Sequence, residues 1–197
     1  MKCESGICGS LIFIFITQNF KNFVHGIDIL TKADYFSLGN LTESYTKVAS
    51  FVARFKEYRP FIIERLWKVK LRHWDIDIRR LTAKSLSIMT SIDPEYVTKN
   101  VLQVLTNRCT HKDILIRHGA ILGVAEIILS LANLSDVKNL ADISSLIVNI
   151  VGIVHAVEKG RLYRGRGGEN IRIVISRLIE CISVAKLPLQ VKLQVSE

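Results

Sequence analysis

The stretch of the sequence most suggestive of chemistry is a basic, glycine-rich loop between Gly160 and Gly168. Glycine-rich loops can bind phosphate through backbone N–H groups at the start of a helix. This loop lacks the Gly-Lys-Ser/Thr ending of a P-loop, and its glycines do not follow the G-x-G-x-x-G spacing of dinucleotide-binding proteins. The sequence therefore favours a structural turn over a phosphate site.

Histidines and cysteines are the other residues with obvious chemical potential. The cysteines are Cys3, Cys8, Cys109 and Cys181, and the histidines are His25, His73, His111, His118 and His155. The cysteines form no C-x-x-C pair, and no histidine pair flanks a glutamate at metalloprotease spacing. We expect reduced thiols of a cytosolic protein, with Cys109 and Cys181 as small core residues, and no catalytic residue, metal or cofactor.

The dipeptide Ile-Arg heads three apolar stripes, at Ile78-Arg79, Ile116-Arg117 and Ile171-Arg172. The first two copies are 38 residues apart (116 minus 78), close to the period of about 40 residues in HEAT and armadillo repeats. The third copy lies 55 residues further on (171 minus 116), which fits the same array if a loop is inserted. Small and apolar residues follow at helical spacing. The sequence predicts an all-α fold, a HEAT/armadillo-like α-solenoid of antiparallel helix pairs.

Each stripe needs a partner helix. Partner helices are predicted at 42–55, from Pro60, from Pro94 after the cap Asp93, and at 136–157, which gives about seven helices and no sheet. The helices that carry the first two stripes are predicted to be capped by Asp75 and Asp113, after turns stabilised by His73 and His111. Arg79 and Arg117, each four residues after one of these aspartates, are predicted to be structural. Gly119 and Gly123 are predicted to let a neighbouring helix approach closely. The third stripe is predicted to be buried and consists of Ile171, Val174, Ile175, Leu178, Ile179 and Ile182.

The chain is basic, with a formal net charge of +9. Between Arg54 and Lys84, ten basic residues face four acidic ones, which accounts for +6 of this charge (10 minus 4). Such a face is either simply solvated or attracts an acidic partner. Nucleic acid is disfavoured because no aromatic residues alternate with the basic ones in a known binding motif. The candidate partner-binding residues are Arg65, Lys68 and Arg72, predicted on one side of the helix that begins at Pro60, and the loop residues Arg161, Arg164 and Arg166.

The beginning of the chain differs from the rest. Residues 1–22 include a short apolar run that is too short to span a bilayer. Two interpretations remain open, a buried plug or a leader that is not part of the domain. The domain itself is predicted at 23–190.

Four motifs in order resemble the tubulin-folding cofactor D family, in its C-terminal part. They lie at 25–40, at 73–81 (His-Trp-Asp-x-x-Ile-Arg-x-Leu), at 117–126 (Arg-His-Gly-Ala, then Ala-Glu) and at 162–169 (Leu-Tyr-Arg-Gly-x-Gly-Gly-Glu). The resemblance covers about residues 23–188, and residues 1–22 have no counterpart in it. Because proteins of this family are several times longer, it implies a fragment.

The resemblance implies a non-enzymatic chaperone segment that binds β-tubulin and takes part in assembly and disassembly of the α/β-tubulin heterodimer. It further implies tubulin-folding cofactors C and E and an ADP-ribosylation-factor-like small GTPase as partners, and stimulation of the tubulin GTPase by the cofactor assembly. A cytoplasmic location follows, with association to microtubules or centrosomes and no integral membrane segment.

Two alternatives have different consequences. A generic HEAT-repeat scaffold that binds an acidic protein would share the periodicity but should lack the four motifs. A regulator that inserts a residue into a GTPase would use Arg164 or Arg166, the loop arginines available for that role.

Overall fold

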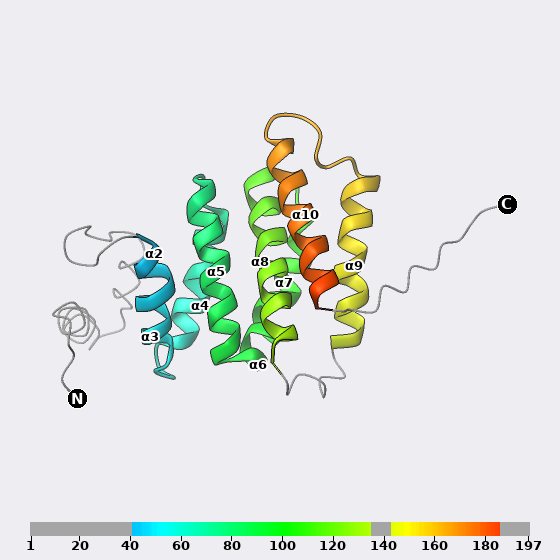
Figure 1. The fold of residues 1–197 in the computed structure, drawn as a ribbon. Helices are drawn as coiled ribbons and strands as arrows, with labels where there is room; N and C mark the ends of the chain where they lie inside the picture. The colour runs from blue at the N-terminus through cyan, green and yellow to red at the C-terminus, as the bar shows by residue number, and fades with distance from the viewer. Residues whose placement is uncertain (1–40, 135–142, 186–197) are drawn as a thin grey trace.

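The computed structural model describes residues 41–134 and 143–185, and these two ranges are helical, with no strand in them (Figure 1). In chain order the helices are α2 (Leu41–Glu43), a π-helical stretch (Ser44–Val48), α3 (Ala49–Ala53), α4 (Arg59–Lys68), a 3₁₀ turn (Lys70–Arg72), α5 (Ile76–Ile92), α6 (Pro94–Val97), a π-helical stretch (Thr98–Leu102), α7 (Gln103–Arg108), α8 (Ile114–Ala132), α9 (Ile143–Lys159) and α10 (Gly168–Val184). Segments that follow one another without a break make seven helical rods in the described ranges, as predicted. The proposed leader at 1–22 lies outside them.

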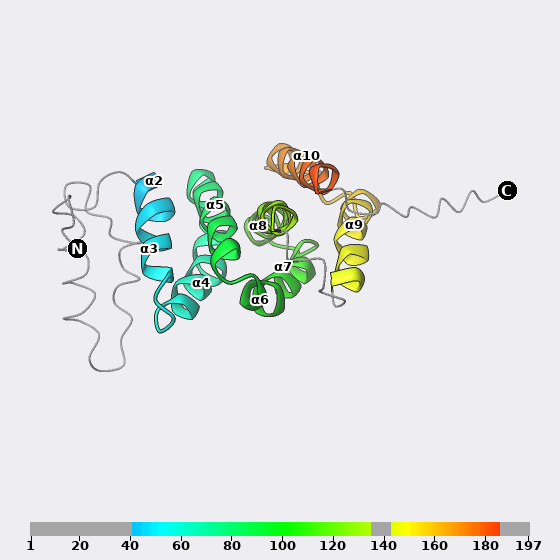
Figure 2. The same ribbon diagram turned by 60° about the horizontal axis from the view of Figure 1, so that its bottom comes forward.

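Successive rods run in opposite directions. Helix α4 leads into α5, α7 into α8 and α9 into α10. Helices α5, α8 and α10 therefore begin at the same edge of the molecule (Figure 1). In the view turned by 60°, α5, α8 and α10 lie on one side of the molecule, and α4, α6, α7 and α9 lie on the other (Figure 2). Helix α8 contacts α5, α7 and α10 and is the centre of the packing.

The helix starts follow from their local sequence. Asp75, Asp93 and Asp113 each accept a hydrogen bond from a backbone N–H in the first turn of α5, α6 and α8, respectively. Such caps satisfy donors that a helix cannot pair internally and stabilise it by about 1 kcal/mol each. Pro60 and Pro94 occupy first-turn positions, where a missing N–H costs nothing. These predicted starts are confirmed, except that α4 begins at Arg59.

Helix α8 is apolar around nearly its whole circumference. By length and composition it could cross a membrane, but 72% of its apolar stretch is buried inside the protein. It buries Ile121, Val124 and Ile127 completely, and Ala125 as well. Because helices pack against it on several sides, it needs no polar face, which is typical of a helix in a protein core.

Two glycines allow this close packing. A β-carbon at Gly119 would lie 1.7 Å from the main-chain oxygen of Leu71, and one at Gly123 would lie 2.8 Å from the Leu71 Cδ2 atom and 3.0 Å from the Leu105 Cδ1 atom. The predicted close approach is confirmed. The elements that approach are the 3₁₀ turn Lys70–Arg72 and α7.

Polar bonds also join the rods. Arg177 of α10 donates to Glu126 of α8 over 2.9 Å and also pairs with Glu180 on its own helix. Ser85 of α5 donates to the carbonyl oxygen of Tyr45 over 2.8 Å. These contacts fix the rotation of each helix about its axis, which apolar packing alone specifies less strictly.

Two expectations about side-chain placement are wrong. Ile179 was expected in the third stripe, yet its side chain is 46% exposed, because no described helix covers that side of α10. Arg72 was expected on the same helix as Arg65 and Lys68, but α4 ends at Lys68 and Arg72 belongs to the following 3₁₀ turn. The other five members of the third stripe are buried or packed against the core.

Candidate functional site: an arginine ladder and the pocket beside it

The turn before α5 is held by three side chains. His73 Nδ1 accepts from the backbone N–H of Asp75 over 3.1 Å, and Asp75 Oδ1 accepts from the N–H of Asp77 over 2.8 Å. Arg79, one turn into the helix, donates from Nη1 to the carbonyl oxygens of His73 and Trp74, at 2.5 and 2.9 Å. The guanidinium therefore closes the turn that leads into its own helix.

The turn before α8 repeats this arrangement 38 residues later (111 minus 73). His111 Nδ1 accepts from the N–H of Asp113 over 3.0 Å, and Asp113 Oδ1 accepts from that of Leu115 over 2.8 Å. Arg117 Nη1 donates to the carbonyl oxygens of His111 and Lys112, at 2.6 and 3.2 Å. The predicted structural roles of both histidines, both aspartates and both arginines are confirmed.

Each arginine also reaches the next rod. Arg79 Nε donates to His118 Nδ1 of α8 over 3.1 Å, and Arg117 Nη2 donates to the carbonyl oxygen of Leu162, in the loop before α10, over 2.9 Å. The two guanidinium groups therefore connect α5 to α8 and α8 to the α10 loop. We call Arg79 and Arg117 the arginine ladder.

The ladder and the neighbouring His118 are buried, and burial lowers their pKa values. Arg79 and Arg117 are 4% and 6% exposed, and burial lowers the pKa of both guanidinium groups. Burial, with smaller contributions from the positive charges of Arg79 and Arg80, lowers the pKa of His118 to about 3. His118 is therefore neutral at pH 7. Because its Nδ1 accepts from Arg79, its proton is on Nε2.

The third Ile-Arg pair does not continue the ladder. Ile171 is buried, as expected, but Arg172 is exposed, and its guanidinium lies 5.7 Å from the ring centroid of Tyr163. The structural role of Arg79 and Arg117 therefore does not extend to Arg172. Helix α10 starts from Gly167 in the left-handed conformation with no side-chain cap, so it has no His-x-Asp turn for an arginine to close.

The glycine-rich loop has the geometry of a structural turn. Gly165 and Gly167 have φ angles of +89° and +80°, which favour glycine, and Arg161 has a φ of +49°. A β-carbon at Gly168 would lie 1.8 Å from the main-chain oxygen of Tyr163, so only glycine fits there. The loop arginines Arg161, Arg164 and Arg166 are exposed, so the turn presents positive charge to solvent.

The basic residues predicted in the Arg54–Lys84 region differ in their surroundings. Arg65 is half-buried, and its Nε atom is buried with no hydrogen-bond partner in the described part of the chain. Lys68 is exposed and pairs with Glu64 over 2.7 Å, and Arg72 is exposed in the turn before α5. Arg72 and the loop arginines therefore lie at one edge of the molecule, where α5, α8 and α10 begin (Figure 1). Arg65 lies deeper, within α4.

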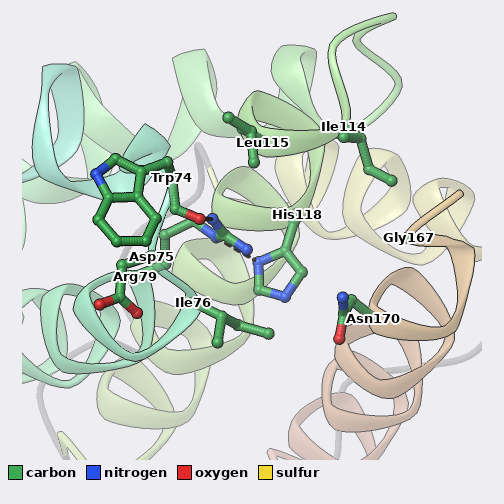
Figure 3. A pocket seen from close by; sticks show the side chains of 9 residues that line it. All are labelled: Trp74, Asp75, Ile76, Arg79, Ile114, Leu115, His118, Gly167 and Asn170. Atoms are coloured by element: carbon green, nitrogen blue, oxygen red, sulfur yellow. Dashed lines mark hydrogen bonds between the residues drawn. The ribbon is translucent and has the colours of Figure 1, made fainter.

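A pocket of about 400 Å³ opens beside the ladder, between the first turns of α5, α8 and α10 (Figure 3). Arg79 and His118 form its inner part, Asn170 of α10 lies opposite them, and Trp74 is at the rim (Figure 3). The remaining lining residues are Asp75, Ile76, Ile114, Leu115 and Gly167. Trp74 is 77% exposed, a high fraction for a tryptophan.

Sequence reasoning missed this pocket. It did not select Trp74, His118 or Asn170, because they are 96 residues apart in the chain (170 minus 74) and follow no chemical motif. The 38-residue repetition of His-x-Asp-x-x-x-Arg was the available signal, since it predicts that two equivalent turns lie side by side.

The described residues contain no group of three or more His, Cys, Asp and Glu side chains that could hold a metal ion. Cys109 and Cys181 are free and buried, as predicted for core residues. Burial raises the pKa of both thiols, that of Cys181 to about 11, so both are neutral and unreactive at pH 7.

Comparison with known proteins connects this chain to one curated relative in particular. It is 31% identical over 166 residues to tubulin-specific chaperone D of Dictyostelium discoideum. The match covers 84% of this chain and 11% of the relative, so the chain spans about a tenth of that protein's length. No protein-family model matches the chain, and no solved structure matches it significantly. The similarity supports a fragment related to tubulin-specific chaperone D.

Proposed function

We propose that this chain is a non-enzymatic segment of a tubulin chaperone of the cofactor D kind. In this role it binds β-tubulin and takes part in assembly and disassembly of the α/β-tubulin heterodimer. The similarity to tubulin-specific chaperone D over 84% of the chain is the observation that carries the proposal. The four sequence motifs, which resemble the C-terminal part of that family, agree with the proposal.

The fold supports a scaffold role. Antiparallel helix pairs, two equivalent turns 38 residues apart (111 minus 73) and an arginine ladder that joins neighbouring rods are features of a HEAT/armadillo-like solenoid. We therefore propose that architecture. Solenoids bind proteins over extended surfaces without covalent chemistry.

The surface supports an acidic partner. Lys68, Arg72, Arg161, Arg164 and Arg166 are exposed, and the last four lie at the edge where α5, α8 and α10 begin. Tubulin is acidic, so this edge is our proposed tubulin-facing surface, attracted at long range. Arg65 is half-buried, so its proposed contribution to binding is through packing within α4 and through its positive charge near the surface.

In the whole assembly, further partners are tubulin-folding cofactors C and E and an ADP-ribosylation-factor-like small GTPase, in the cytoplasm and at microtubules or centrosomes. Tubulin itself hydrolyses GTP, and the cofactor assembly stimulates it. If this segment supplies a stimulating residue, the exposed loop arginines Arg164 and Arg166 are the candidates.

The test is capture of purified αβ-tubulin by the 197-residue chain, at low and moderate salt. Two variants with equal charge change separate specific from general attraction: Arg164→Glu with Arg166→Glu at the loop, and Lys56→Glu with Lys84→Glu at exposed positions elsewhere. We expect the loop variant to bind less well than the control variant, and higher salt to weaken the wild type because screening shortens the Debye length from about 10 Å at 0.1 M to about 3 Å at 1 M.

Failure to capture tubulin under any of these conditions would contradict the proposal for this segment. Equal loss in both variants would favour the generic alternative, a scaffold that attracts acidic proteins through its overall charge.

A further inference from the structure

We infer that the pocket beside the arginine ladder is a docking site for an acidic segment of a partner protein that inserts one apolar side chain. The inference deepens the proposed function, because it rests on an acidic protein partner and names the part of the surface that holds it. It adds Trp74, His118 and Asn170, none of which belongs to the basic surface described above.

His118 places a hydrogen-bond donor at the wall of the pocket. His118 is 2% exposed, and its Nδ1 is occupied by Arg79. The ring lies against the pocket opposite Asn170, and the proton assigned to Nε2 gives the pocket wall a hydrogen-bond donor (Figure 3). This donor can bond to an acceptor that a ligand brings into the pocket, such as a peptide carbonyl or a carboxylate.

The pocket combines apolar walls with an exposed aromatic rim. Ile76, Ile114 and Leu115 line the pocket, and Trp74 at the rim is 77% exposed. Tryptophan is enriched in protein interfaces, where its ring buries a large area at a small cost in conformational entropy. A volume of about 400 Å³ is near the lower end for small-molecule sites and suits one or two side chains of a peptide.

The edge around the pocket is positively charged and complements an acidic partner. The three segments that border the pocket, 72–80, 111–118 and 161–172, contain nine Arg or Lys and four Asp or Glu residues, a net charge of +5 (9 minus 4). The first turns of α5, α8 and α10 add the positive ends of three helix dipoles at the same edge (Figure 1). An acidic chain is therefore attracted to the edge before its apolar residue reaches the pocket.

The experiment uses a fluorescein-labelled polyglutamate peptide with a central phenylalanine, titrated with the full chain and followed by fluorescence anisotropy. Two further peptides separate the contributions: polyglutamate with a central alanine lacks the anchor, and polylysine with a central phenylalanine reverses the charge. We expect the phenylalanine–glutamate peptide to bind at least about tenfold more tightly than either, since a buried aromatic anchor dominates the energy of such contacts.

Two variants of the protein test the site. Trp74→Ala should weaken binding of that peptide by about tenfold, while Phe61→Ala, which truncates another aromatic side chain that is 49% exposed, should not change it. Asn170→Asp places a negative charge in the pocket, so this variant should bind the acidic peptide less tightly. The same charge lies in the first turn of α10, where it stabilises the helix, so the melting temperature of the variant should not fall.

Equal affinity for the phenylalanine and alanine peptides, or full binding by both Trp74→Ala and Asn170→Asp, would overturn the inference. If either of these results were found while the chain still captured tubulin, the docking site would be excluded and the proposed function would still be supported. Specific peptide binding without tubulin capture would support the site and contradict the proposed function.

Discussion

Replacing Gly119 by alanine should destabilise the protein, although alanine is the better helix former. The new β-carbon would lie 1.7 Å from the main-chain oxygen of Leu71. Non-bonded heavy atoms pack at about 3.5 Å, so the two groups must separate by about 1.8 Å (3.5 minus 1.7). The obstacle is backbone and cannot rotate away as a side chain would.

The expected cost follows from these distances. Overpacking in a core costs about 1 to 3 kcal/mol, and a main-chain clash belongs at the upper end. Exchanging glycine for alanine inside a helix stabilises the folded protein by about 1 kcal/mol through the higher helix propensity of alanine. The net loss is about 2 kcal/mol, which lowers the melting temperature by about 4 to 8 °C in a chain of this size.

Two other helical glycines are matched controls in the same assay, thermal unfolding followed by circular dichroism. Gly123→Ala meets only the ends of the Leu71 and Leu105 side chains, at 2.8 and 3.0 Å, so its clash and its propensity gain should roughly cancel. Gly152→Ala in α9 meets nothing within 4 Å and should raise the melting temperature by about 2 to 4 °C. An unchanged or raised melting temperature for Gly119→Ala would refute the packing of Leu71 against α8.

Three further predictions concern the ladder and the loop. Arg79→Lys should cost about 1 to 3 kcal/mol in urea unfolding, because one ammonium group cannot reach two carbonyls and His118 together; wild-type stability in this variant would contradict the ladder. The folded-state pKa of His118 is about 3, below the unfolded value of about 6.5, so its contribution to stability is complete above pH 6.5 and is lost as the pH falls. The free energy of unfolding should therefore fall between pH 7 and pH 5 by about 2 kcal/mol more in the wild type than in His118→Gln. An equal fall in both proteins would exclude a buried neutral histidine. Gly168→Ala should lower the melting temperature more than Gly165→Ala, since a β-carbon at Gly168 meets the Tyr163 oxygen at 1.8 Å while one at Gly165 meets nothing within 4 Å; the reverse order would show that backbone conformation, not space, makes glycine necessary in the loop.

Local sequence determined the helices and their ends. Asp75, Asp93 and Asp113 cap the helices they precede, because a capping side chain bonds to backbone only two or three residues away. The periodic apolar residues predicted which face of α5 is buried, and the pair Gly119 and Gly123 predicted close packing of α8, because both signals repeat within one or two helical turns. An all-α fold could be predicted from these features alone.

The tertiary structure decided what each face meets. Ile179 and Ile182 are both apolar members of the third stripe, but only Ile182 is covered, because coverage depends on where α8 and α9 lie. Arg79 and Arg172 share the same Ile-Arg signal, yet only Arg79 closes a turn, because the preceding His-x-Asp is present before α5 and absent before α10. The pocket needs residues from three rods. Sequence spacing cannot supply their relation, since the distance between segments far apart in the chain is set by how the helices stack.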